Sequence, residues 1–119
     1  MSRQNRFDPT RSNVCDETLT TWLRSPISGD LQDVPGIGPV AVSKMADVGV
    51  VNTFQLIGKY LCLKNGTVLE HQDAMYQWLV DIGINASRNN IIVALAEKCD
   101  IFMPGSCDIS HVRSNGRED

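Results

Sequence analysis

The chain has 119 residues, of which 42% are hydrophobic, and its formal net charge is −3. This length suits one domain with a modest core. No apolar run approaches the ~20 residues of a membrane span, and we expect no signal peptide because the first residues are too polar. The negative charge disfavours bulk electrostatic capture of nucleic acid. A local basic patch could still act, since salt screens charges beyond ~10 Å.

The cysteines and histidines predict neither metal binding nor catalysis. No pair of cysteines has Cys-x-x-Cys spacing and the two histidines stand apart from them, so we expect no zinc site and no cofactor. The histidines also lack an acid–base partner at usable spacing, so we expect no enzyme activity. Cys62 and Cys99 fall in apolar helical patterns and are predicted to be reduced core residues in an intracellular compartment.

The ends of the chain are predicted to flank one domain. Residues 1–14 are polar and carry Arg3, Arg6 and Arg11, which is typical of a flexible basic arm. Residues 15–104 form the predicted domain, and residues 105–119 the predicted disordered tail. The first helix is expected over residues 16–24, with one apolar face and acidic residues at its start. That face consists of Leu19, Trp22 and Leu23.

The next segment, Val34-Pro35-Gly36-Ile37-Gly38-Pro39, predicts a tight turn between two short helices. The glycines permit positive φ and a bare backbone, and Pro39 suits the first turn of a helix. We expect Ser28 or Asp30 to cap the short helix before the turn, and Ile37 to enter the core. Such a helix-hairpin-helix directs free N–H groups and the positive end of a helix dipole at one spot, which suits a phosphate. The alternative is a loop that merely connects two helices.

Three further helices follow. Residues 54–63 are predicted to begin after an N-cap at Thr53, and Gly58 to mark close packing of another backbone. The fourth helix ends at Gly83, with His71 at a solvated start. Its predicted buried face comprises Ala74, Trp78, Leu79 and Ile82, with Met75 at the edge; Asp73 and Asp81 are expected to face solvent. Asn85 or Ser87 is expected to cap the last helix, residues 86–102, whose buried face is Ile91, Ile92, Leu95, Ala96 and Cys99. No β pattern of useful length appears, so the fold class is all-α with five short helices.

From residue 22 to residue 103 these motifs resemble the barrier-to-autointegration factor family. The resemblance rests on Gly36-Ile37-Gly38, on the helix with Lys44, and on later motifs in the family's order. Those motifs are Leu61-Cys62-Leu63-Lys64, Trp78-Leu79-Val80-Asp81, Gly83-Ile84-Asn85-Ala86 and Glu97-Lys98-Cys99-Asp100-Ile101-Phe102. It implies a SAM-like helical bundle and a homodimer that binds and bridges double-stranded DNA without sequence specificity. It also implies nuclear (and cytoplasmic) location, chromatin association, and LEM-domain and lamin partners at the nuclear envelope.

The resemblance implies two DNA-facing edges. Carried over by position, the first comprises Gly36, Ile37, Gly38, Val40, Ala41 and Lys44, and the second Asn85, Ala86, Ser87 and Arg88. The chain departs from the family where Ser43-Lys44 replaces a lysine pair, where Pro39 replaces a glutamate, and where Ser87 and Asn90 replace basic residues. Two alternatives therefore stay open. One is a diverged paralogue that has lost DNA and acts as a protein-interaction or dimerisation module. The other is an accessory domain in DNA repair or recombination.

Overall fold

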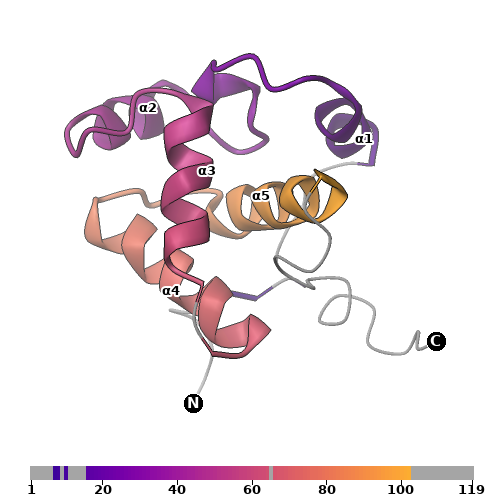
Figure 1. Cartoon of the computed structure of the whole chain (residues 1–119). Coiled ribbons are helices and arrows are strands. Elements are labelled where there is room, and N and C mark those ends of the chain that lie inside the picture. The colour runs from indigo at the N-terminus through magenta and orange to yellow at the C-terminus, as the bar shows by residue number, and fades with distance from the viewer. Residues whose placement is uncertain (1–6, 9, 11–15, 65, 103–119) are drawn as a thin grey trace.

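The computed structural model describes Phe7, Asp8, Thr10 and residues 16–64 and 66–102. Their regular elements are all helical, which confirms the all-α prediction (Figure 1). In chain order these are α1 (Asp16–Arg24), the 3-10 helix η2 (Leu31–Asp33), α2 (Pro39–Ala46), α3 (Thr53–Cys62), α4 (Val68–Asp81) and α5 (Arg88–Phe102). The predicted domain end at residue 104 and the predicted tail lie outside the described residues.

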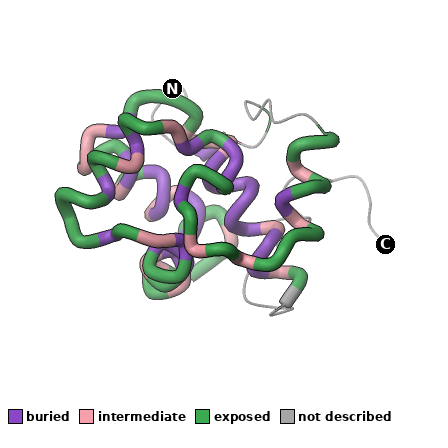
Figure 2. Tube along the Cα trace, turned by 90° about the horizontal axis from the view of Figure 1, so that it is seen from above, coloured by how far each residue is buried: buried purple, intermediate pink, exposed green. Residues whose placement is uncertain are grey.

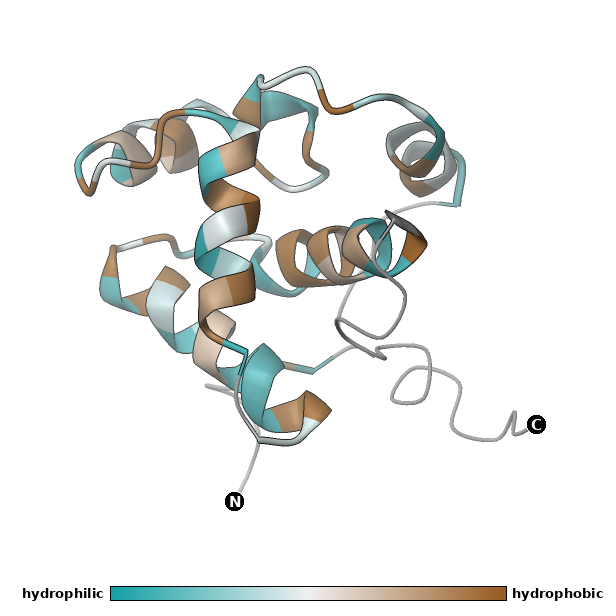
Figure 3. Cartoon of the chain, viewed as in Figure 1, coloured by the Kyte–Doolittle hydropathy of each residue, from teal (hydrophilic) through white to brown (hydrophobic). Residues whose placement is uncertain are grey.

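Helix α5 forms the centre of the fold, and α1, α3 and α4 all contact it. The predicted face of α5 is confirmed, but burial extends around the helix, because every residue from Ile91 to Ala96 is buried. Hydrophobic residues follow one another after the polar first turn of this helix (Figure 3), as expected for a helix covered on several sides. Seen from above, the buried positions gather in the middle of the molecule and the outer loops are exposed (Figure 2). The helix begins at Arg88, two residues later than predicted.

Helix α1 is held against α5 by polar contacts of two side chains, Trp22 and Lys98. The Trp22 indole Nε1 donates to the Ala94 carbonyl at 2.9 Å. The buried Lys98 ammonium lies 4.7 Å from the Trp22 ring centroid and donates to the carbonyls of Trp22, at 2.5 Å, and Ser25. A cation at the carbonyl end of a helix complements the helix dipole. Burial nevertheless lowers the pKa of Lys98, because it disfavours the charged form. The predicted α1 face is confirmed, with Trp22 buried and Leu19 and Leu23 packed partly against the core.

Helix α3 corrects three predictions, namely the N-cap, the core position of Cys62 and the close packing at Gly58. Asn52 is its N-cap, accepting from the Gln55 N–H at 2.9 Å, whereas Thr53 is the first helical residue and is buried. The buried positions are Thr53, Leu56, Ile57 and Tyr60, spaced at 0, 3, 4 and 7. A second apolar series, with Phe54, thereby turns outward: Phe54 is 59% exposed and Cys62 is exposed. Gly58 is exposed too, and a Cβ there would meet nothing within 4 Å, so it packs against no backbone of the described chain.

Helix α4 begins earlier and buries a different face than predicted. Thr67 and Glu70 form a reciprocal capping box at its start. The buried residues are His71, Gln72, Met75, Tyr76 and Leu79, whereas Ala74, Trp78 and Ile82 are only half-buried. The predicted solvated position of His71 is wrong because the ring stacks on Tyr60, with centroids 4.4 Å apart. Its Nε2–H donates to the Tyr60 carbonyl at 2.8 Å, and burial lowers the pKa of His71.

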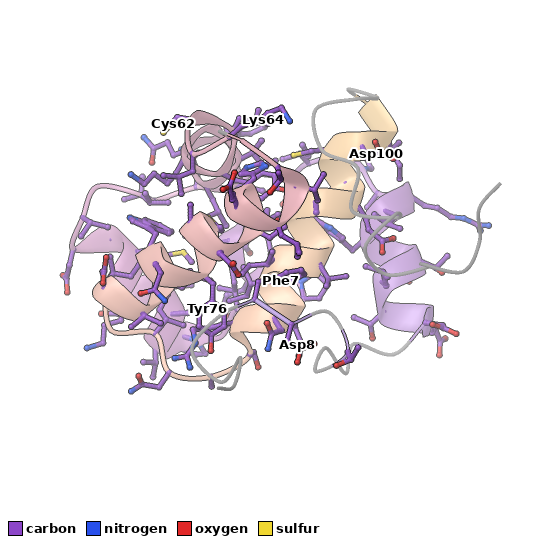
Figure 4. The ribbon with its side chains drawn as sticks, turned by 90° about the horizontal axis from the view of Figure 1, so that it is seen from below. Phe7, Asp8, Cys62, Lys64, Tyr76 and Asp100 are labelled. Atoms are coloured by element: carbon purple, nitrogen blue, oxygen red, sulfur yellow. The ribbon has the colours of Figure 1, made fainter. Side chains whose placement is uncertain are left out.

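The N-terminal segment contributes a core residue, contrary to the predicted free arm. Phe7 is fully buried, and its N–H donates to the Asp73 carboxylate at 3.1 Å. The Asp8 N–H donates to the Asn89 side chain at 2.9 Å. Both residues therefore lie against α4 and α5 (Figure 4). Asp73 is thus a hydrogen-bond acceptor rather than a solvent-facing charge, while Asp81 is exposed as predicted. Arg3, Arg6 and Arg11 lie outside the described residues.

Candidate nucleic-acid interface

The turn between η2 and α2 is held in place by local backbone bonds. Asp30 caps η2 by accepting from the Gln32 N–H at 2.9 Å. The Val34 N–H then donates to the Leu31 carbonyl at 3.1 Å, and the Ile37 N–H donates to the Val34 carbonyl at 3.0 Å. The side chains of Val34 and Ile37 are both buried, so the turn is tied to the core on its inner side. This confirms the predicted Asp30 cap and the predicted position of Ile37.

Gly36 allows this turn to pack closely against the start of α5. Its φ of +97° belongs to the left-handed region that favours glycine. A Cβ there would lie 3.1 Å from Ile91 Cγ1 and 3.2 Å from the Cβ atoms of both Asn90 and Ser87. Both the backbone angle and the available space therefore require glycine. The contact brings together the two sequence regions, near residues 36–44 and 83–88, that the resemblance implied.

Gly38 leaves the start of α2 open. It is the N-cap residue and makes no side-chain cap, and Pro39 follows at the first helical position. Because the first N–H groups of a helix have no partner within the helix and proline has none, Val40 and Ala41 present the free amides. A Cβ at Gly38 would meet nothing within 4 Å. Two backbone donors and the positive end of the helix dipole thus lie next to the open space at Gly38, an arrangement that favours an anion.

A loop after α4 forms the second wall. The Ile84 N–H donates to the Leu79 carbonyl at 3.0 Å, and the buried Ile84 side chain anchors the loop, leaving Asn85 and Ala86 exposed. Lys44 reaches from α2 across to this wall, because a Cβ at Gly83 would lie 3.4 Å from its Nζ. Between the walls lies a groove of about 630 Å³. Its lining consists of Gly36, Gly38, Pro39, Val40, Ala41, Lys44, Gly83, Ile84, Asn85 and Ala86.

The groove gathers most of the predicted site residues and leaves three outside its lining. Ile37 is buried on the inner side of the turn. Ser87, whose φ is +62°, packs against Gly36. The Arg88 guanidinium donates to the Ile84 carbonyl and to the Tyr76 hydroxyl. The sequence-based prediction missed three lining residues, Pro39, Gly83 and Ile84, although each belongs to a motif that it had singled out. Lys44 is the one charged side chain in the lining.

The described residues contain neither a candidate metal site nor a candidate membrane-spanning helix. Within residues 16–64 and 66–102 and the three described N-terminal residues, no three His, Cys, Asp or Glu side chains are grouped to hold a metal ion. None of the described helices has the length and apolar character needed to cross a membrane. In comparisons with family models, curated proteins and solved structures, nothing matches this chain.

Proposed function

We propose that the groove binds the phosphates of double-stranded DNA without reading sequence, and that the protein acts as a homodimer that bridges duplexes. The open start of α2 carries this proposal. Gly38 has no Cβ to hold a phosphate away, and the amides of Val40 and Ala41 lie directly beyond it. Backbone amides at a helix start are a recurring anion site. Contacts to phosphate position a protein on DNA but carry no sequence information.

The groove would bind with few counterions released. Lys44 supplies its single charged side chain, and the other donors are neutral amides. Each phosphate neutralised by a cation contributes a slope of about −0.9 to the dependence of log affinity on log salt. We therefore expect a shallow salt dependence and modest affinity for each protomer. Because a dimer would bind DNA through two grooves at once, avidity would supply much of its overall affinity for DNA.

The outer face of α3 supports the homodimer. Phe54, Gly58 and Cys62 are exposed there at helical spacing, and Val51, just before the helix, is exposed as well. Glycine inside a helix costs about 1 kcal/mol relative to alanine, yet nothing in the described chain lies near the Cβ position of Gly58. A second copy packed against this face would bury the Phe54 ring and use the close approach that Gly58 permits. The resulting dimer would carry two grooves.

The sparse charge of the groove favours one second candidate, an interaction module that has kept the dimer and lost DNA. Ser43 is exposed beside Lys44, where the resembled family has a second lysine. LEM-domain and lamin-type partners, chromatin association and a nuclear location follow from the resemblance and belong to both candidates. Among the described residues, no feature outside the hairpin supports a role in DNA repair.

The proposal is tested by fluorescence anisotropy with a short random-sequence duplex at two salt concentrations. Gly38→Glu places a carboxylate in the open space at the helix start, where its φ of −109° suits any residue. We expect it to abolish binding while leaving the fold intact. Gly38→Gln, of equal size and no charge, is the matched control and should lose less. Binding of wild type at neither salt, with a dimer present in light scattering, would favour the interaction module.

Two further variants separate the parts of the proposal. Lys44→Met should weaken duplex binding and reduce the salt slope by about one phosphate contact, because it removes the cation of the groove. Gly58→Glu should leave binding by each protomer intact and abolish both the dimer and bridging, since Gly58 lies outside the groove. Bridging that persists in a monomeric Gly58→Glu protein would contradict the dimer model.

A further inference from the structure

We infer that Arg88 is a positioning residue that latches the second wall of the groove, rather than a contact to phosphate. The inference rests on the proposed DNA-binding function of the groove and changes the role of one predicted site residue. It also explains why an arginine occurs at the start of α5, where a cation is disfavoured by the helix dipole.

The Arg88 guanidinium joins three segments. Its Nη1 donates to the Ile84 carbonyl at 2.8 Å, and its Nη2 donates to the Tyr76 hydroxyl at 3.0 Å. The guanidinium carbon also lies 4.8 Å from the Tyr76 ring centroid, within the range of a cation–π contact. Tyr76 is buried on α4, Ile84 is buried in the loop, and Arg88 begins α5. One side chain therefore connects both flanking helices to the loop between them.

This loop combines left-handed backbone angles with an exposed middle, so a connection to both flanking helices would restrain it. Gly83 and Ser87 both have positive φ, at +92° and +62°, and the latter angle is uncommon for a residue with a Cβ. Asn85 and Ala86 between them are exposed. Ile84 is bonded at both ends, through its N–H to Leu79 and through its carbonyl to Arg88. Removing Arg88 would free the carbonyl end.

The position of the loop decides the shape of the groove. The Lys44 side chain packs against Gly83 at one end of the loop, and Ser87 packs against Gly36 at the other end. A loop that shifts would lose its contact with the Lys44 side chain at Gly83 and its contact with the turn at Gly36, which would change the width of the groove. Arginine suits this task because its planar fork makes two directed hydrogen bonds at once, whereas the lysine ammonium is a single point charge.

The test compares Arg88→Lys, Arg88→Met and Tyr76→Phe in duplex binding over a salt series. A latch predicts that both Arg88 variants lose roughly tenfold in affinity, that Tyr76→Phe loses a smaller factor in the same direction, and that the salt slope stays at the wild-type value. Arg24→Met, which removes an exposed arginine from α1, is the matched control and should bind like wild type. Wild-type affinity in Arg88→Lys, together with a reduced slope in Arg88→Met, would show direct phosphate contact and overturn the inference.

A measurement without DNA keeps this inference separate from the proposed function. Hydrogen exchange of the Ile84 amide, which is bonded to the Leu79 carbonyl, should rise in the free Arg88→Met protein, and exchange in α1 and α3 should remain at the wild-type rate. Unchanged exchange at Ile84 would refute the latch whether or not the protein binds DNA. A wild-type protein that fails to bind the duplex, yet shows this local increase in the variant, would refute the function and leave the latch standing.

Discussion

The groove beside α2 and the pocket beside α1 are opposite in charge. The groove contains one charged side chain, the cation Lys44, together with free amides at a helix start. The pocket, of about 350 Å³, is lined by the carboxylates of Glu17 and Asp33 and by hydroxyl side chains. Helices α1 and α2 stand at opposite ends of the view in Figure 1. The net charge of −3 is a sum over the whole chain and does not give the local charge of either region.

The difference in charge between the groove and the pocket indicates how a protein with a negative net charge could present a site for DNA. At physiological ionic strength charges are screened beyond about 8 Å, so a phosphate in the groove is governed by the groups next to it. In low salt, where screening is weaker, the acidic end would repel DNA that approaches from that side. The net charge alone argues against nucleic-acid binding, whereas the local geometry of the groove supports the proposal.

The largest effect we expect distinguishes the two glycines of the turn. Gly36→Ala should lower the free energy of unfolding by about 2–3 kcal/mol, because a φ of +97° is strained for alanine and its Cβ would press on Ile91. Gly38→Ala should change it by less than about 0.5 kcal/mol, since its surroundings are open. Urea denaturation measures both. Equal losses would mean that the space at Gly38 is closed, and the groove would lose its proposed entrance.

Gly36 and Gly38 also show why the turn was predictable from sequence while much else was not. A turn is specified by the residues within it, so Pro35, Gly36 and Ile37 were placed correctly. Helix α3 offers two apolar series, and only tertiary packing decides that Leu56 faces inward and Phe54 outward. Phe7 is a single apolar residue in a polar segment, with no periodicity to mark it as core. One of the two hydrogen bonds of Arg88 goes to Tyr76, twelve residues away, which no local pattern predicts.

A smaller effect is expected on lowering the pH, which should reduce the free energy of unfolding and leave duplex binding by the groove unchanged. Burial, with the charge of Lys64 adding to it, lowers the pKa of His71 below its ordinary 6.5, whereas the hydrogen bond to Tyr60 opposes the shift. The unfolded chain therefore binds more protons than the native protein below pH 6.5. Stability should be complete above that pH and fall as pH drops from 6.5 towards the native pKa, by at most about 1.4 kcal/mol per pH unit.

Urea denaturation between pH 7.5 and 5.5 measures this loss, and His71→Gln should remove the part that belongs to His71. Duplex affinity of the folded protein should stay constant over the same range, because the lining of the groove contains no His, Asp or Glu. An affinity that changes with pH while the protein remains folded would show that a titrating group outside the lining acts on the groove.

The smallest effect should come from the acidic end itself. Neutralising both carboxylates of the pocket, as Glu17→Gln with Asp33→Asn, should raise duplex affinity a few-fold in low salt, where charges act over about 30 Å at 0.01 M. At 0.15 M the gain should vanish, because screening confines electrostatic effects to the immediate surroundings of the phosphate. A gain that survives at 0.15 M would place the pocket beside the path of the DNA. The two regions would then form one interface, and the acidic end would limit its affinity directly rather than repel DNA from a distance.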